Sequence, residues 1–152
     1  MAINIEPAVI PHLVVDDAAA AIDFYVKAFG AEELGRVPGP DGRLVHAAVT
    51  INGSTVMLND DFPEMCGGTS MTPKSLGGTP VTIHLTVTDV DAKFQRAVDA
   101  GATVVMAVED QFWGDRYGVL ADPFGHQWSL GQPVREVSME EIQASMSAEA
   151  NG

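Results

Sequence analysis

Apolar residues at helical spacing first appear after a run that favours a β-strand. That run covers residues 8–15, and the apolar positions after it lie four and three residues apart, as on one face of a helix: Ile22, Val26 and Phe29. Asp17 and Gly30 are placed to begin and end this helix. Three strand-like runs follow at 32–38, 43–51 and 54–60, and Asn52-Gly53 predicts a tight hairpin between the last two.

The same order of elements returns in the second half of the chain. Aligning Asp17 with Asp89 places His12 on His84. A second helix, capped by Asp89 and stopped at Gly101, has the apolar stripe Val90, Phe94 and Val98. Further strand-like runs lie at 103–109, 116–121 and 126–131, with a turn over Asp122–Gly125. We therefore predict an α+β fold built from two βαβββ modules, residues 8–60 and 80–131, within a single domain over residues 1–140.

Two segments lie outside the modules. Residues 61–79 are rich in Gly, Pro, Ser and Thr and show no periodicity, so we expect a linker or mobile loop, with a lid over a site as the alternative. Asp60 and Asp61, where the linker begins, are expected to be solvated. In the tail, residues 132–152, a capping box at Ser138–Glu141 precedes apolar positions at helical spacing, Met139, Ile142 and Met146. The tail therefore predicts a short peripheral helix, which could also be a docking element for a protein partner.

Charge and composition exclude several classes of function. The chain of 152 residues has 8 Lys+Arg and 21 Asp+Glu, a formal net charge of −13, so binding to a nucleic acid backbone is not expected. Cys66 is the only cysteine, which excludes an intramolecular disulfide and a zinc cluster built on cysteines. No run approaches the roughly 20 apolar residues of a membrane span. We expect a cytoplasmic protein that does not associate with membranes.

Three motifs resemble one family. They are Ala21–Glu33 (AIDFYVKAFGAEE), Gln111–Gly118 (QFWGDRYG) and Asp122–Trp128 (DPFGHQW). With the paired modules, they resemble the vicinal oxygen chelate superfamily, which includes glyoxalase I, bleomycin resistance proteins and extradiol dioxygenases, and within it the PhnB-like branch. The resemblance implies that the modules form a curved, cup-shaped mixed sheet whose hollow face binds a small molecule, in a homodimer.

The resemblance also implies where a metal would be held. Metal-dependent members carry one ligand on the first strand and one glutamate on the last strand of each module, and the matching positions here are Ile10, Thr82, Met57 and Ser129. None of these is an adequate ligand for a divalent cation, so we expect no metal and no other cofactor. His12 and His84 lie two residues beyond the first-strand positions and share their face of the strand. The alternative is a metal-dependent lyase, isomerase or dioxygenase that uses these displaced histidines and borrows a further donor.

The candidate ligand-binding residues follow from strand alternation and from the motifs. We expect His12, His46, Met57 and His84 to point into the cup, as hydrogen-bonding or ligand-binding groups or as a general base. Trp113, Arg116 and Tyr117 could hold an anionic or planar ligand, although pairing of Arg116 with a nearby acid is equally expected. Trp128 alternates away from the cup and is expected in the core. The predicted function is small-molecule binding, and no catalytic residue is assigned.

Overall fold

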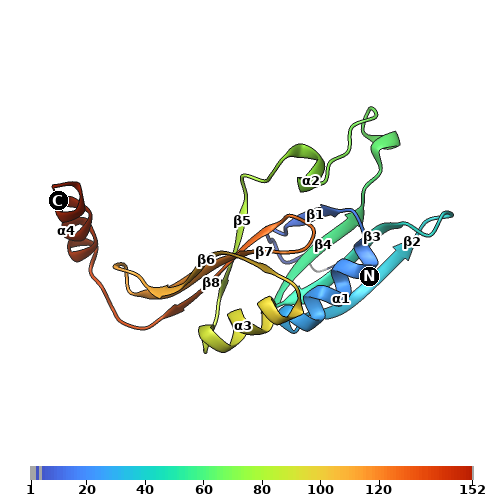
Figure 1. Ribbon diagram of the computed structural model, residues 1–152. Helices are drawn as coiled ribbons and strands as arrows, with labels where there is room; N and C mark the ends of the chain where they lie inside the picture. Colours follow the sequence, from blue (N-terminus) through green and yellow to red (C-terminus); the bar gives the residue numbers. More distant parts are fainter. Residues whose placement is uncertain (1–2, 4, 152) are drawn as a thin grey trace.

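The computed structural model describes residue 3 and residues 5–151, and it contains two βαβββ modules (Figure 1). The elements of module 1 are β1 (His12–Val15), α1 (Ala18–Phe29), β2 (Glu32–Pro38), β3 (Leu44–Ile51) and β4 (Ser54–Asp60). Its strands form one mixed sheet in the order β1-β4-β3-β2, in which β1 and β4 are parallel. Asn52 and Gly53 both have positive φ, as the predicted hairpin requires.

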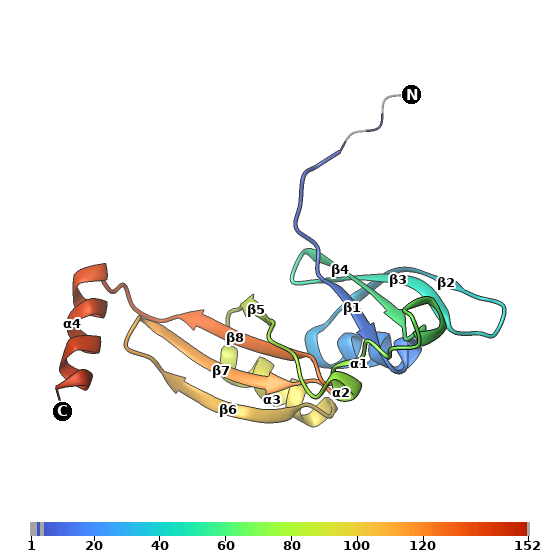
Figure 2. The same cartoon turned by 90° about the horizontal axis from the view of Figure 1, so that it is seen from above.

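Module 2 repeats this arrangement. Its elements are β5 (Thr82–Thr86), α3 (Val90–Ala100), β6 (Thr103–Asp110), β7 (Asp115–Ala121) and β8 (Gln127–Pro133), with the sheet order β5-β8-β7-β6. The α+β fold with two βαβββ modules is therefore confirmed. The two sheets are not joined to each other, however, so the cup expected from the resemblance is not closed within one chain (Figure 2).

The helix starts show how far the repeat extends. The side chain of Asp17 accepts a hydrogen bond from Ala20 N at 3.0 Å, as predicted. Asp89 begins α3 but makes no such bond, so its predicted capping role is wrong. Its backbone lies in the left-handed region, and the first amide of α3, Val90 N, is instead bonded by Gln132 Oε1 at 3.0 Å.

Asp60 has the matching role in module 1. Its Oδ1 accepts from Ala18 N at 2.7 Å, and its Oδ2 accepts from Leu44 N at 2.6 Å. Asp60 is buried, so the expectation that it is solvated is wrong. The reason is that the last strand of each module ends beside the first turn of its own helix, where a buried acceptor is needed.

The two modules are held together along α1 and α3, which pack against each other (Figure 1). Tyr25 on α1 donates its hydroxyl to Asp122 Oδ2 of module 2 at 2.7 Å, and Trp128 Nε1 donates to the same oxygen at 2.9 Å. Arg96 on α3 donates to the carbonyl of Lys27 at 2.7 Å. Tyr25 and Trp128 are fully buried, so the expectation that Trp128 lies in the core is confirmed.

The linker and the tail both contain helix. The linker forms a 3₁₀ turn, η1 (Pro63–Met65), and one short helix, α2 (Pro73–Leu76). The tail forms α4 (Met139–Ala150), where Ser138 Oγ accepts from Glu141 N at 3.1 Å as the capping box predicted. None of the residues of α4 is buried, and both views show α4 apart from the modules (Figures 1 and 2). Within the described part of the chain, no helix has the length and hydropathy of a membrane span.

Candidate functional site

Each sheet has one face packed against its helix and one face that is half-open. Along β4, for example, Val56 and Leu58 are buried while their neighbours are only partly buried. On the half-open face of module 1, His12 pairs with Met57 across β1 and β4. The ring of His46 meets the ring of His12 edge-on, with centroids 6.2 Å apart. The structure thus brings together three of the predicted site residues: His12, His46 and Met57.

A chain of aromatic rings covers the half-open face of module 2, and we call it the ring cluster: Phe112, Trp113, Tyr117 and His84. Successive ring centroids lie 5.2, 5.5 and 5.9 Å apart, and the rings of His84 and Tyr117 are stacked. These distances are typical of favourable aromatic contacts. The ring cluster therefore unites three further predicted residues, and Phe112 is an addition that the sequence analysis did not single out.

Two residues of β8 fix the position of His84. Ser129 Oγ lies 2.8 Å from His84 Nδ1, and Ser129 itself is buried. A Cβ atom added to Gly131 would lie 2.8 Å from Cε1 of His84, so only glycine leaves room for the imidazole. With Nδ1 engaged by Ser129, Nε2 of His84 is the nitrogen left for a ligand.

Arg116 lies apart from the ring cluster. It is adjacent to Tyr117 on β7, and adjacent residues of a strand point to opposite faces. Its guanidinium donates to both carboxylate oxygens of Asp91 on α3, at 2.7 and 2.8 Å, and to Asp110 at 3.1 Å. The hydrogen bond from Arg116 holds the pKa of Asp91 below its usual value. The pairing of Arg116 with nearby acids is therefore observed, and its role toward a ligand stays a prediction.

A cavity of about 510 Å³ lies between β1 and β5, the neighbouring edge strands of the two sheets, and we call it the seam cavity. Apolar side chains from both modules line it, among them Ile10, Val81 and Ile83. Its polar groups include His12, Thr82, His126 and Gln127. A mostly apolar lining with a few polar groups, at this volume, is typical of small-molecule sites.

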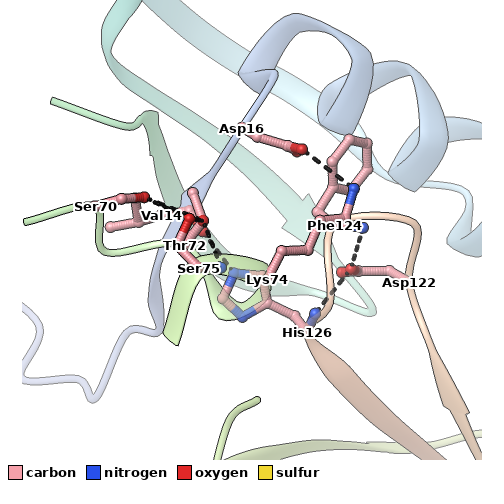
Figure 3. A network of polar contacts seen from close by, with 9 residues as sticks. All are labelled: Val14, Asp16, Ser70, Thr72, Lys74, Ser75, Asp122, Phe124 and His126. Atoms are coloured by element: carbon pink, nitrogen blue, oxygen red, sulfur yellow. Dashed lines mark hydrogen bonds and ion pairs between the residues drawn. The ribbon is translucent and has the colours of Figure 1, made fainter. Parts of the chain in front are cut away.

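Figure 3 shows how His126 is held at the seam cavity. Its Nε2 lies 2.8 Å from the carbonyl oxygen of Val14, which can only accept, so the ring donates from Nε2. Asp122 Oδ1 accepts from the amides of Phe124 and His126 at 2.9 and 3.0 Å and so shapes the turn that carries this ring. His126 belongs to the motif Asp122–Trp128 but was not predicted as a site residue, since its partner on β1 is 112 positions away in the chain.

The linker braces the same region. Lys74 on α2 forms an ion pair with Asp16 at 3.1 Å, and a group of hydroxyls on Ser70, Thr72 and Ser75 lies beside it (Figure 3). Pro73 is buried at the turn after β7, where a Cβ atom added to Gly125 would lie 2.8 Å from Pro73 Cβ. The linker is thus packed against both modules.

The four positions at which relatives would hold a metal do not form a metal site. Ile10 and Thr82 both line the seam cavity, but Met57 lies on module 1 and Ser129 is bonded to His84 on module 2. Their donor set is one thioether and two hydroxyls, which does not fit a divalent cation. Of the displaced histidines, His12 lines the seam cavity and His84 lines an adjoining cavity, so a metal site that uses both with a borrowed donor stays a prediction. No group of three or more His, Cys, Asp or Glu in the described residues could hold a metal ion.

Comparison with known proteins places this geometry in context. A family model described as the Glyoxalase/Bleomycin resistance protein/Dioxygenase superfamily matches residues 6–130. An uncharacterized protein of Mycobacterium bovis is 81% identical over 152 residues, covering 100% of both chains. The crystal structure of TioX from Micromonospora sp. ML1 is 30% identical with a TM-score of 0.65, and the match covers 85% of this chain and 100% of TioX. An X-ray structure of an Arabidopsis thaliana gene product is 29% identical with a TM-score of 0.65, covering 83% of this chain and 98% of that one.

Proposed function

Because the chain belongs to the glyoxalase/bleomycin resistance protein/dioxygenase superfamily, we propose that it binds a small, largely apolar molecule in the seam cavity without the metal that other members use. The observation that carries this proposal is the seam cavity itself. Ile10 and Thr82, which stand where metal-dependent relatives have ligands, contribute a branched aliphatic side chain and a hydroxyl to that cavity. With these two residues, the seam cavity is suited to contact with an apolar molecule and not to binding a metal ion.

The polar groups of the seam cavity indicate which polar groups the bound molecule would carry. His12 and Gln127 can each donate or accept a hydrogen bond, so a ligand with one or two neutral polar groups fits the lining better than a charged one. The second cavity shares Val9, Pro11 and Ile83 with the first and reaches His84, the end of the ring cluster. A ligand that extends into it would place a flat ring against stacked aromatic side chains.

The same account includes a homodimer. Five side-chain hydrogen bonds between the modules, from Tyr25, Asn52, His126 and twice from Arg96, hold the two sheets in their present relation. The half-open faces of the two sheets therefore stay uncovered within one chain, and a second copy is the simplest cover for them. The proposal also assigns the protein to the PhnB-like branch of the superfamily, which the three motifs support, and a cytoplasmic location.

Binding of the neutral dye Nile red to the full-length protein tests this function. We expect saturable binding with a blue-shifted emission, because the dye leaves water for an apolar cavity. Val81→Asp places a charge in the lining and is expected to weaken binding at least about tenfold, since the bound dye would take water away from an unpaired carboxylate. The matched control is Val105→Asp on β6, because Val105 is as exposed as Val81 (55% against 62%) but lies outside the cavity. Equal affinities of the two variants would overturn the proposal.

A further inference from the structure

Helix α4 is an arm added to the fold of this superfamily. The family model ends at residue 130, and α4 begins at Met139. The match to TioX covers all of that protein but leaves 15% of this chain unmatched. The mycobacterial relative, in contrast, aligns over the full length of this chain. The near relative therefore also has the segment that forms the arm. Because the superfamily fold is complete without this segment, its function has to be sought outside the fold.

The face of α4 that should be packed has no partner in the chain. Met139, Ile142 and Met146 lie on one side of the helix, and Met139 and Met146 are 66% and 49% exposed. Glu140 and Glu141 lie on other sides, and α4 contains no basic residue. A helix of 12 residues is marginal alone in water and gains its stability by packing its apolar face.

Hydrogen bonds at the base of the arm direct α4 away from its own modules. The amides of Val134 and Arg135 both donate to the carbonyl of Gly114 at 2.9 and 3.2 Å, and Arg135 Nη2 donates to the carbonyl of Phe112 at 3.2 Å. A Cβ atom added to Gly114 would lie 2.5 Å from the carbonyl oxygen of Arg135, so this attachment requires glycine. The arm thus leaves from the tip of the β6–β7 hairpin, far from α1 and α3 (Figures 1 and 2).

A small cavity lies where α1 and α3 meet, and we call the surface around its mouth the junction groove. It contains a cavity of about 100 Å³ lined by apolar residues such as Phe29, Leu85 and Leu130, with Lys93 and Arg96 at its edge. The guanidinium of Arg96 donates to the backbone carbonyls of Lys27 and Val26 at the end of α1. Among the described residues, neither Lys93 nor Arg96 forms an ion pair with an acid. Two of the chain's 8 bases therefore lie at this cavity without an ion pair.

We infer that α4 of one copy docks across the junction groove of a second copy. The cavity has room for one side chain of α4, Ile142 or Met146, and the glutamates at the edges of that face would lie near Lys93 and Arg96. The acidic helix and the two bases at the cavity are complementary in charge. If two copies exchange their arms, both contacts form in one two-fold dimer. The inference takes from the proposed function only that two copies associate.

Sedimentation equilibrium of the full-length protein tests the apolar part of this contact. Ile142→Asp puts a charge on the docking face of α4 and should raise the dimer dissociation constant at least about tenfold. Ala144→Asp is the matched control, because it adds the same charge to the same helix on a side away from Ile142. Equal dissociation constants for the two variants, or a wild-type chain that stays monomeric, would overturn the inference.

Charge reversal tests where α4 docks. Lys93→Glu should raise the dissociation constant about fivefold, since each of two contacts loses an ion pair. Glu141→Lys in the same chain should restore most of that loss, whereas Lys74→Glu, at a lysine outside the groove, should have no effect. Lys93→Glu acting no more strongly than Lys74→Glu would overturn the placement in the groove. Nile red binding to the same variants separates this result from a failure of the proposed function, because the seam cavity contains none of these residues.

Discussion

Replacing Tyr25 by phenylalanine is expected to destabilise the protein, because the Tyr25 hydroxyl joins the two modules through one buried carboxyl group. The hydroxyl donates to Asp122 Oδ2 at 2.7 Å, and the same oxygen accepts from Trp128 Nε1 at 2.9 Å. The other oxygen of Asp122 accepts two backbone amides. All four partners are donors, which is the arrangement that an ionised carboxylate satisfies.

The size of the effect follows from this geometry. A buried hydrogen bond to a charged group contributes about 1.5–3 kcal/mol. Tyr25→Phe removes one bond and leaves Asp122 Oδ2 its bond from Trp128, so the loss should lie in the lower part of that range, at about 2 kcal/mol. For a chain of this length such a loss lowers the melting temperature by roughly 4–8 °C.

Urea denaturation followed by far-ultraviolet circular dichroism measures this loss as a shift in the midpoint, expected to be about 1 M. Tyr117→Phe is the matched control: Tyr117 is the other of the two tyrosines, and its hydroxyl has no hydrogen-bond partner among the described residues. Equal stability of Tyr25→Phe and Tyr117→Phe would refute the reasoning, since it would mean that the bond between the modules contributes nothing.

The same hydroxyl gives stability a dependence on alkaline pH. Burial, and then the nearby Asp122, raise the pKa of Tyr25 well above its ordinary value. A raised pKa means that the folded protein holds this proton more tightly than the unfolded chain does, so its contribution is complete below about pH 10 and is lost as pH rises further. The stability difference between wild type and Tyr25→Phe should therefore shrink above that pH. A difference that stays constant from pH 7 to 11 would contradict the assignment.

Three further substitutions test other parts of the account. Asp60→Ala leaves two buried backbone amides without an acceptor and should cost about 3 kcal/mol in urea denaturation, whereas a loss below about 1 kcal/mol would contradict its role. Arg116→Gln removes the bond that lowers the pKa of Asp91, so a carboxyl NMR titration should show that pKa rising to its ordinary value, and an unchanged pKa would contradict the pairing. Gly131→Ala should push the His84 ring from its place and shift its imidazole NMR signals, which would stay unchanged if the contact at 2.8 Å were absent.

Local signals in the sequence were sufficient for most of the fold. The hairpin residues Asn52 and Gly53 fixed β4 at its observed bounds, and Asp17 and Gly30 fixed those of α1. The first strand is shorter than the predicted run at 8–15 because Pro11 has no amide hydrogen to continue the ladder, and pairing with β4 begins at His12. Such errors arise where pairing between strands, and not local preference, sets the end of an element.

The parts of the site that escaped prediction depend on contacts between distant residues. The first amide of α3 is bonded by Gln132, 42 positions away, where local reasoning favoured Asp89. Asp122 receives the Tyr25 hydroxyl across 97 positions. Arg116 and Tyr117, however, are neighbours on β7, so strand alternation alone puts their side chains on opposite faces of the sheet. The prediction that both hold one ligand did not take this alternation into account.

The central claim is that the seam cavity binds a small molecule without a metal, and the metal content of the protein tests it most directly. Full-length protein produced in medium supplemented with iron, manganese, nickel and zinc can be measured by plasma mass spectrometry after exhaustive dialysis. We predict far less than one metal ion per chain, because Ile10, Thr82, Met57 and Ser129 form no adequate donor set. Stoichiometric, tightly bound metal that is lost in His12→Ala or His84→Ala would contradict the account and would favour a metal-dependent enzyme.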